Sequence, residues 1–253
     1  TGSINGYHIN DYSFPKNENQ KFEICLGPIL TQNTNWINVE KALIKLNNKK
    51  LINPNTLIQA NDDTIKKLIK PAGYFNQKTK KIKIFTKFFL SLNGNTPTRT
   101  ELLELWGIAL ETADSILLYA YKVPTFVVDT YTKRILIHLK IINENSDYDK
   151  IKKLFEDNIQ KDYKIYQEYH ALIVEHAKRY YSKKPYGIND KILNQKTQKI
   201  SEIGLNNLNI RIQPGKLVRS EKEWREALTR NMLKSKLWSL NENSVFLNKN
   251  SLF

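Results

Sequence analysis

The sequence predicts an all-α protein, and three observations support this fold class. Along most of the chain, apolar residues recur at intervals of three and four, which is the spacing of one face of a helix. Glycine is scarce, with 9 residues in a chain of 253. The polar breaks between the apolar stripes are short, as expected of a compact helical body. Hydrophobic residues make up 40% of the chain, which is enough to bury a core.

The expected helices follow one another from the N-terminal region to about residue 181. Each early helix is marked by an inward apolar stripe. The four stripes are Phe22, Leu26, Ile29 and Leu30; Val39, Ala42, Leu43 and Leu46; Ile65, Leu68 and Ile69; and Ile82, Phe85, Phe88 and Phe89 in a helix over 78–92. Further helices are expected over 112–121, 126–139, 148–159 and 163–181.

The pattern changes near residue 183, where proline and glycine become frequent among scattered polar residues. We therefore expect a helical body over residues 1–187 and a C-terminal appendage of mixed α/β character over 188–253. In the appendage, residues 208–212 and 244–247 are typical of short strands. A capping box formed by Ser220 and Glu223 predicts a helix that runs to about Leu237.

Charge and cysteine content restrict the possible functions. The chain has 40 Lys and Arg against 25 Asp and Glu, a net charge of +15, which suits an acidic polymer or an anionic surface. The single cysteine, Cys25, excludes internal disulfides and cysteine-ligated zinc or iron–sulfur sites within one chain. No apolar run approaches the roughly 20 residues of a membrane span, and no signal-peptide pattern opens the chain. We therefore expect a soluble, cytoplasmic protein.

Residues 102–134 carry the most informative pattern, with a helix, a tight turn at Gly107, a second helix and an apolar run that closes on Asp129. A hairpin of two short helices points several backbone N–H groups one way and can bind an anion such as a DNA phosphate. The alternative is an ordinary packing joint between two helices. Asp129 precedes a helix that opens at Thr130, so it is either an N-cap or a carboxylate aimed into a cleft. Taken alone, its position favours the cap.

Taken together, these segments resemble the helix-hairpin-helix DNA glycosylases of the endonuclease III superfamily. The family pattern Leu-Pro-Gly-Ile/Val-Gly-x-x-Thr-Ala stands here as LWGIALETA over 105–113, and the later Val-Asp-Thr/Ala stands as VDT over 128–130. Residues 22–34, 70–81 and 166–178 look like the other signature segments, so the resemblance covers roughly residues 12–185. It implies a monomeric protein with two helical lobes around a cleft that binds double-stranded DNA containing a damaged base.

The resemblance also implies roles for individual residues. Asp129 matches the catalytic aspartate, which stabilises positive charge on the sugar and activates water. Gln32, followed by Asn33, matches the wedge that fills the gap left by a flipped nucleotide.

Three further groups of positions are implied. The hairpin contacts to a DNA phosphate are expected at Gly107, Ala109 and Thr112. The base pocket is expected at Tyr12, Phe14, Trp36, Glu111 and Lys178. A monovalent cation is expected on the carbonyl groups of Leu103, Leu105 and Ile108. For the three pocket aromatics the alternative is core packing, and for Lys178 it is a solvated lysine.

Two departures from the family pattern indicate the subtype. Glu111 stands where lyase-active members carry the lysine that forms a Schiff base with the sugar, which implies a monofunctional glycosylase. Residues 179–186 contain no cysteine where many members hold a four-cysteine iron–sulfur loop, which implies that the cluster is absent. Both departures look most like the 3-methyladenine branch. Two smaller ones lie in the hairpin, where Trp106 replaces a proline and Ala109 replaces a glycine.

The sequence leaves alternatives open. Within the same class, the substrate could be a mismatched or an oxidised base. The chain could instead be a non-catalytic DNA-binding module that uses the hairpin as a phosphate clamp, although Asp129 at the matched spacing argues against this. An RNA or membrane-surface binder is supported only by the charge. His170 and His176 lie six residues apart, which favours structural roles over a paired metal site, and Cys25 is expected to be a small core residue.

Overall fold

The computed structural model describes residues 12–193 of the chain. Within this range every regular element is helical, which confirms the predicted all-α class. The chain divides into two compact units, Thr1–Pro124 (unit 1) and Thr125–Phe253 (unit 2). The strands and the helix predicted for the appendage lie outside the described residues. None of the helices described is long and apolar enough to cross a membrane.

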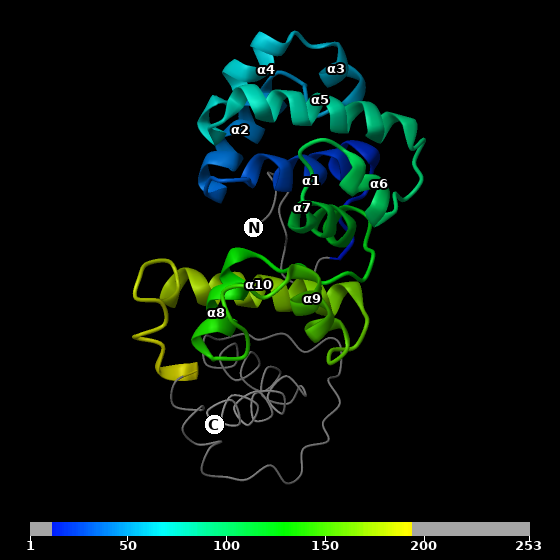
Figure 1. Cartoon of the computed structure of the whole chain (residues 1–253). Coiled ribbons are helices and arrows are strands. Elements are labelled where there is room, and N and C mark those ends of the chain that lie inside the picture. The colour runs from blue at the N-terminus through cyan, green and yellow to red at the C-terminus, as the bar shows by residue number, and fades with distance from the viewer. Residues whose placement is uncertain (1–11, 194–253) are drawn as a thin grey trace, which may run out of the picture. The chain divides into compact units, whose positions relative to one another are not determined.

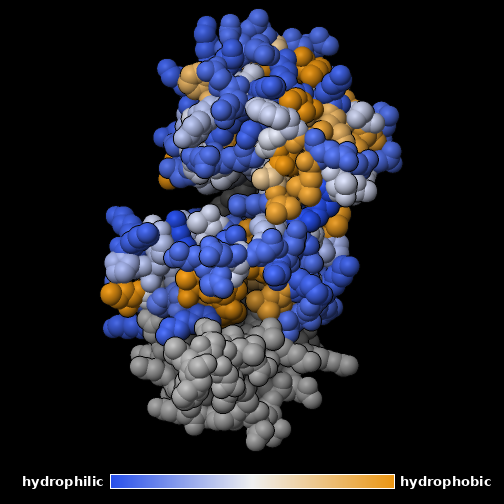
Figure 2. Space-filling view, in the orientation of Figure 1, coloured by the Kyte–Doolittle hydropathy of each residue, from blue (hydrophilic) through white to orange (hydrophobic). Residues whose placement is uncertain are grey.

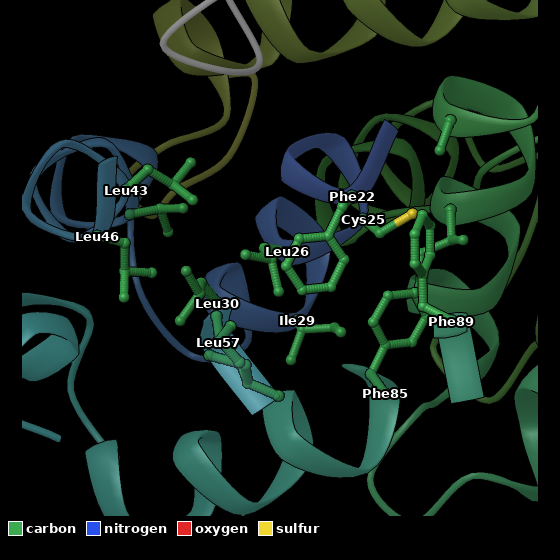
Figure 3. Close-up of a cluster of buried hydrophobic side chains, with 14 of the residues drawn as sticks. Phe22, Cys25, Leu26, Ile29, Leu30, Leu43, Leu46, Leu57, Phe85 and Phe89 are labelled. Atoms are coloured by element: carbon green, nitrogen blue, oxygen red, sulfur yellow. The ribbon is translucent and has the colours of Figure 1, made fainter. Parts of the chain in front are cut away.

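Unit 1 is built around α5, which packs against α1, α3 and α4 (Figure 1). The elements of unit 1 are α1 (Glu18–Thr31), α2 (Trp36–Asn48), α3 (Pro54–Gln59), α4 (Asp62–Ile69), the 3-10 helix η1 (Lys70–Ala72), α5 (Phe75–Ser91), α6 (Arg99–Glu104), α7 (Leu110–Ser115) and the π-helical turn η2 (Ile116–Ala120). The predicted apolar stripes of α1, α2 and α5 meet in one cluster, which Figure 3 shows in close-up.

Aromatic rings and the cysteine occupy the centre of this cluster. The ring of Phe22 lies 6.4 Å from that of Phe85 and 5.1 Å from that of Phe89. Cys25 is fully buried beside them, and burial raises the pKa of its thiol far above the usual range. The prediction that Cys25 is a core residue is therefore confirmed.

On the face shown in Figure 2, most of the described residues at the surface are hydrophilic. The large hydrophobic residues that remain exposed within the described range are Ile37, Ile44, Tyr74, Trp106 and Ile188.

The short helix α3 was not predicted, although its start signals stand in the sequence. Asn53 accepts hydrogen bonds from the amides of Asn55 and Thr56, and Pro54 occupies the first helical turn, where its missing N–H costs nothing. A six-residue helix carries too few apolar residues to form a recognisable stripe, which is why the periodicity did not show it. The C-terminal end of α3 is held by Lys83, whose Nζ donates to the carbonyl groups of Ile58 and Ala60 at 2.8 and 2.6 Å.

Unit 2 contains α8 (Thr130–His138), α9 (Tyr148–Glu156) and α10 (Tyr163–Tyr180). The prediction of a helix over 126–139 is wrong at its start, because residues 126–129 are not helical. Side chains of α9 take the place of helical partners there: the Phe126 amide donates to Glu156 Oε1 at 2.8 Å and the Val128 amide to the Tyr148 hydroxyl at 3.3 Å. The stiff β-branched side chains of Val127 and Val128 also favour an extended backbone.

A buried polar network closes the C-terminal end of α10. His176 Nε2 lies 2.6 Å from Asp190 Oδ2, and the hydroxyl of Tyr181 donates to the same oxygen at 2.9 Å. All three side chains are inaccessible to solvent, and the amides of Ile192 and Leu193 donate to Asp190 Oδ1. His176 therefore has the structural role that its position predicted.

Candidate active site

Helices α6 and α7 form the predicted hairpin in unit 1. A capping box of Thr98 and Glu101 begins α6. Arg99 donates two hydrogen bonds, at 2.9 and 3.1 Å, to the fully buried carboxylate of Asp114 on α7. Such a two-bond guanidinium–carboxylate pair fixes direction as well as distance, so it ties the two helices together.

The two residues at the ends of the turn have different backbone requirements. Gly107 has φ of +85°, a left-handed conformation that glycine adopts at far lower cost than other residues. Ala109 has φ of −98° and ψ of 171°, which is extended backbone that any residue adopts. The replacement of the family's second glycine by Ala109 therefore causes no backbone strain. Neither amide donates a hydrogen bond within the described part of the chain.

The close approach of Lys81, on α5, also favours glycine at position 107. A Cβ atom at this position would lie 2.5–2.8 Å from carbon atoms of the Lys81 side chain. Lys81 therefore lies directly on the turn, and burial lowers the pKa of its ammonium group. Lys80, the preceding residue, is exposed instead, and its Nζ lies 4.4 Å from the ring centroid of Trp106.

Gln32, at the C-terminal end of α1, is bonded to the hairpin. Its Nε2 donates to the Gly107 carbonyl at 3.1 Å and lies 3.0 Å from the hydroxyl oxygen of Thr112. Its Oε1 accepts a hydrogen bond from Lys81 Nζ. The structure thus brings together three predicted DNA-binding residues, Gln32, Gly107 and Thr112. Asn33 beside them is exposed, with φ of +56°.

The end of α1 is fixed by a second lysine of α5. Lys78 is almost fully buried, and its Nζ donates to the carbonyl groups of Leu30 and Ala72 at 2.8 Å each. Burial lowers the pKa of Lys78 to about 8. This lysine joins the turn that precedes Gln32 to η1.

In unit 2, Asp129 is the N-cap of α8. Its Oδ1 accepts hydrogen bonds from both the amide and the hydroxyl of Thr132, each at 2.7 Å. Its Oδ2 lies 3.7 Å from His170 Nε2 on α10, and the side chains of Asp129 and His170 are 13% and 15% exposed. The cap interpretation of Asp129 is therefore confirmed for Oδ1, while Oδ2 takes no part in the cap and lies near His170.

The surroundings of Asp129 favour its charged form. Burial alone would raise the pKa of this carboxyl, but the neighbouring His170 and the two Thr132 hydrogen bonds outweigh it and lower the pKa below the usual range. A carboxylate of this kind is negatively charged at neutral pH and can stabilise a developing positive charge. The expectation that His170 is merely structural did not anticipate its place beside Asp129.

The residues predicted for the base pocket belong to both units, four to unit 1 and one to unit 2. Tyr12 and Phe14 are half-buried in unit 1, and the Tyr12 carbonyl accepts a hydrogen bond from Lys122 at 2.9 Å. Trp36 packs against the apolar cluster of unit 1, as its core-packing alternative expected. Glu111 is exposed on α7, in unit 1, and Lys178 is exposed on α10, in unit 2.

Residues that could hold a cation lie in the hairpin. The carbonyl of Leu105 accepts the turn hydrogen bond from the Ile108 amide at 3.0 Å, which leaves its second lone pair for another partner. The carbonyl groups of Leu103 and Ile108 lie in the same short segment. Among the described residues, no group of three or more His, Cys, Asp or Glu side chains could hold a metal ion.

The chain matches the HhH-GPD superfamily of base excision DNA repair proteins over residues 26–161, which is more than half of its length. The chain belongs to this superfamily. It is 47% identical over 175 residues to a Methanocaldococcus jannaschii protein named "Putative DNA repair glycosylase", covering 65% of this chain and 80% of the relative. It is 32% identical over 130 residues to endonuclease III of Thermotoga maritima, covering 48% and 59%.

Solved structures of the superfamily share the fold. The H. pylori 3-methyladenine DNA glycosylase bound to 1,N6-ethenoadenine is 27% identical, with a TM-score of 0.56 over 66% of this chain and 87% of that chain. A non-covalent endonuclease III–DNA complex is 20% identical, with a TM-score of 0.59 over 71% and 85%. The superfamily match, the similarity to the Methanocaldococcus jannaschii protein and the similarity to the H. pylori enzyme together show that the chain is a DNA glycosylase of base excision repair.

A second similarity concerns the C-terminal part. Residues 161–253 match a family described as "Putative transmembrane protein". This match covers less than half of the chain and falls mostly outside the described residues.

Proposed function

We propose that the protein is a monofunctional DNA glycosylase that hydrolyses the N-glycosidic bond of a flipped alkylated purine, such as 3-methyladenine, in double-stranded DNA. The observation that carries the proposal is the geometry of Asp129. Its carboxylate is fixed through Oδ1 and kept ionised, while Oδ2 is not committed to the helix cap.

In the proposed reaction, the bond between C1′ of the sugar and the base nitrogen breaks, and the base leaves with the bonding electron pair. Positive charge develops on the sugar, and the Asp129 carboxylate stabilises this charge more than it stabilises the uncharged ground state. Water then adds its oxygen to C1′ and gives up a proton, for which Asp129 is the nearest acceptor in this proposal. The products are the free base and an abasic site.

One similarity supports the proposed substrate class, and one residue supports the proposed monofunctional chemistry. The H. pylori 3-methyladenine glycosylase is similar over 66% of this chain. Glu111 stands where lyase-active relatives carry a lysine, and a carboxylate cannot form a Schiff base with the sugar. An alkylated purine that already carries positive charge is also a good leaving group, so a single carboxylate can suffice for its release.

The proposed contacts to DNA are distributed over the hairpin and its neighbours. The Gly107 and Ala109 amides would bind a phosphate, and Gln32 would fill the space left by the flipped base. The cation on the hairpin carbonyl groups and the five base-pocket residues named above remain predictions. Because the chain has one cysteine and that cysteine is buried in the unit 1 core, we propose that the enzyme works without an iron–sulfur cluster and that the purified protein contains no iron.

A panel of duplexes, each with one defined lesion, tests this proposal. We expect release of free 3-methyladenine, with an abasic strand that breaks only after alkali treatment and no covalent adduct trapped by borohydride. Preferential release of a mismatched or oxidised base would replace the proposed substrate. A strand nicked by the enzyme itself, together with a borohydride-trapped adduct, would contradict the monofunctional assignment.

A further inference from the structure

Gln32 has bonding partners in three separate segments of unit 1. Its side-chain amide reaches the turn carbonyl of Gly107, the hydroxyl of Thr112 on α7 and the ammonium of Lys81 on α5. The bond to Gly107 joins residues 75 positions apart, and the bond to Thr112 joins residues 80 apart. Both ends of the amide are therefore used in the DNA-free protein.

These contacts converge on the turn that is expected to bind phosphate. Lys81 covers Gly107 so closely that no Cβ fits between them. Gln32 holds the Gly107 carbonyl, and the rigid peptide plane fixes the Ile108 amide with it. That amide donates to the Leu105 carbonyl and lies between the Gly107 and Ala109 amides that are proposed to bind phosphate. The orientation of the turn thus depends on a side chain from α1, in addition to the Arg99–Asp114 pair that joins α6 to α7.

The backbone that leads to Gln32 is held in place by Lys78. Lys78 donates to the Leu30 carbonyl, two residues before Gln32, and to the Ala72 carbonyl of η1. The last turn of α1 is therefore anchored before its side chain reaches the hairpin. A rigid support of this kind is what a positioning residue needs, because it lowers the entropy lost when the bond forms.

We propose that Gln32 is a positioning residue for the hairpin, and that it holds the turn in its phosphate-binding geometry before any base is flipped. The inference rests on the proposed function, because the hairpin geometry matters only to a protein that binds duplex DNA. It differs from a wedge role, which begins only once a nucleotide has left the stack. A wedge that serves no other purpose would leave binding to undamaged DNA unchanged.

The test measures affinity for an undamaged duplex in matched variants. We expect Gln32→Ala and Thr112→Val each to weaken binding by roughly three- to tenfold, the range for one or two lost hydrogen bonds. The double variant should bind no more weakly than Gln32→Ala alone, because Gln32→Ala already removes the bond that Thr112→Val removes. Thr112→Ser keeps the hydroxyl and should restore binding. Gln20→Ala, the same change at the other end of α1, is the control and should bind as the wild type does.

Amide hydrogen exchange in the free protein supplies a reading that does not require DNA. Gln32→Ala should increase exchange at residues 105–112 and leave α8–α10 unchanged. Wild-type affinity for undamaged DNA in Gln32→Ala, or unchanged exchange at the hairpin, would overturn the positioning role. Additive losses in the double variant would also overturn it, because they would mean that Gln32 and Thr112 contact DNA independently. If the wild type binds no duplex at all, the proposed function fails, while the exchange experiment still decides whether Gln32 orders the hairpin.

Discussion

The hairpin site of unit 1 and the carboxylate site of unit 2 are built in different ways. Around the hairpin, Gln32, Lys81, Gly107 and Thr112 come from segments far apart in the sequence. Around Asp129, the two shortest polar contacts come from Thr132, a residue three positions away. The hairpin site therefore depends on tertiary packing. At the carboxylate site, the bonds between Asp129 and Thr132 form as soon as α8 forms. Changes at the two sites should differ accordingly in how far their effects spread.

The largest expected effect comes from removing the charge at Asp129. Asp129→Asn keeps the shape and the capping ability of the side chain but deletes the carboxylate charge. Base release should fall on the order of 10²-fold or more, with duplex affinity nearly unchanged. Stability at neutral pH should fall modestly, because the folded protein favours the charged form of Asp129. Single-turnover base release and duplex binding, measured on the same preparation, check this. Full activity in Asp129→Asn would remove Asp129 from the reaction.

The next largest effect is expected at Gly107. Gly107→Ala must place a side chain at φ of +85°, which costs about 1–2 kcal/mol, and must displace Lys81 from the turn. The turn of the variant is expected to relax in the free protein, so duplex binding, which needs the original turn, must restore the strained geometry. Duplex affinity should then fall roughly tenfold, since about 1.4 kcal/mol corresponds to a factor of ten. Equilibrium binding to an undamaged duplex measures this. Ala109→Gly is the matched comparison; it should change affinity little, because Ala109 has ordinary extended backbone.

Gly107 and Asp129 also indicate how much of the site the sequence could predict. The turn at Gly107 and the cap at Asp129 were predicted because both depend on short-range patterns. The positions of Lys81 and His170 were not predicted. A doubled lysine normally indicates a solvated face, and only tertiary packing brings one member of this pair onto the hairpin. The extended start of the 126–129 segment was also missed, since its amide partners, Glu156 and Tyr148, lie on another helix.

Lys78 provides a smaller effect, on stability, that depends on pH. Lys78→Met leaves the carbonyl groups of Leu30 and Ala72 without their donor, so it should destabilise the protein by about 1–3 kcal/mol at neutral pH. The pKa of Lys78 is about 8 in the folded protein, below the usual value of about 10.4. The unfolded chain therefore binds more protons between these two values, and wild-type stability should rise with pH in this window relative to Lys78→Met.

Denaturant unfolding of both proteins at pH 7, 8.5 and 10 measures this difference directly. Lys83→Met is the matched control, because it also removes a lysine that caps carbonyl groups in unit 1. A wild-type advantage that is constant across this range would mean that Lys78 keeps an ordinary pKa. An advantage that falls with rising pH would mean that the folded protein raises it.

The smallest expected effect is at Thr132, and it tests whether the carboxylate site is as local as its contacts indicate. Thr132→Val keeps the shape of a buried side chain and the backbone amide bond to Asp129, but removes the hydroxyl bond to Oδ1. The pKa of Asp129 should move up toward its usual value of about 3.9. The folded wild type has a lowered pKa there, so the associated stability is present above the unfolded value and is lost as pH falls through the folded value. At pH 7 the variant should therefore be less stable by about 0.5–1.5 kcal/mol, with a smaller deficit at pH 3. Unfolding at both pH values and a carbon-detected titration of the Asp129 carboxyl measure the two effects.

The effect of Thr132→Val on base release at neutral pH should be slight, because Asp129 is still ionised in the variant. A loss as large as that of Asp129→Asn would mean that the hydroxyl of Thr132, and not only the charge of Asp129, acts in the reaction.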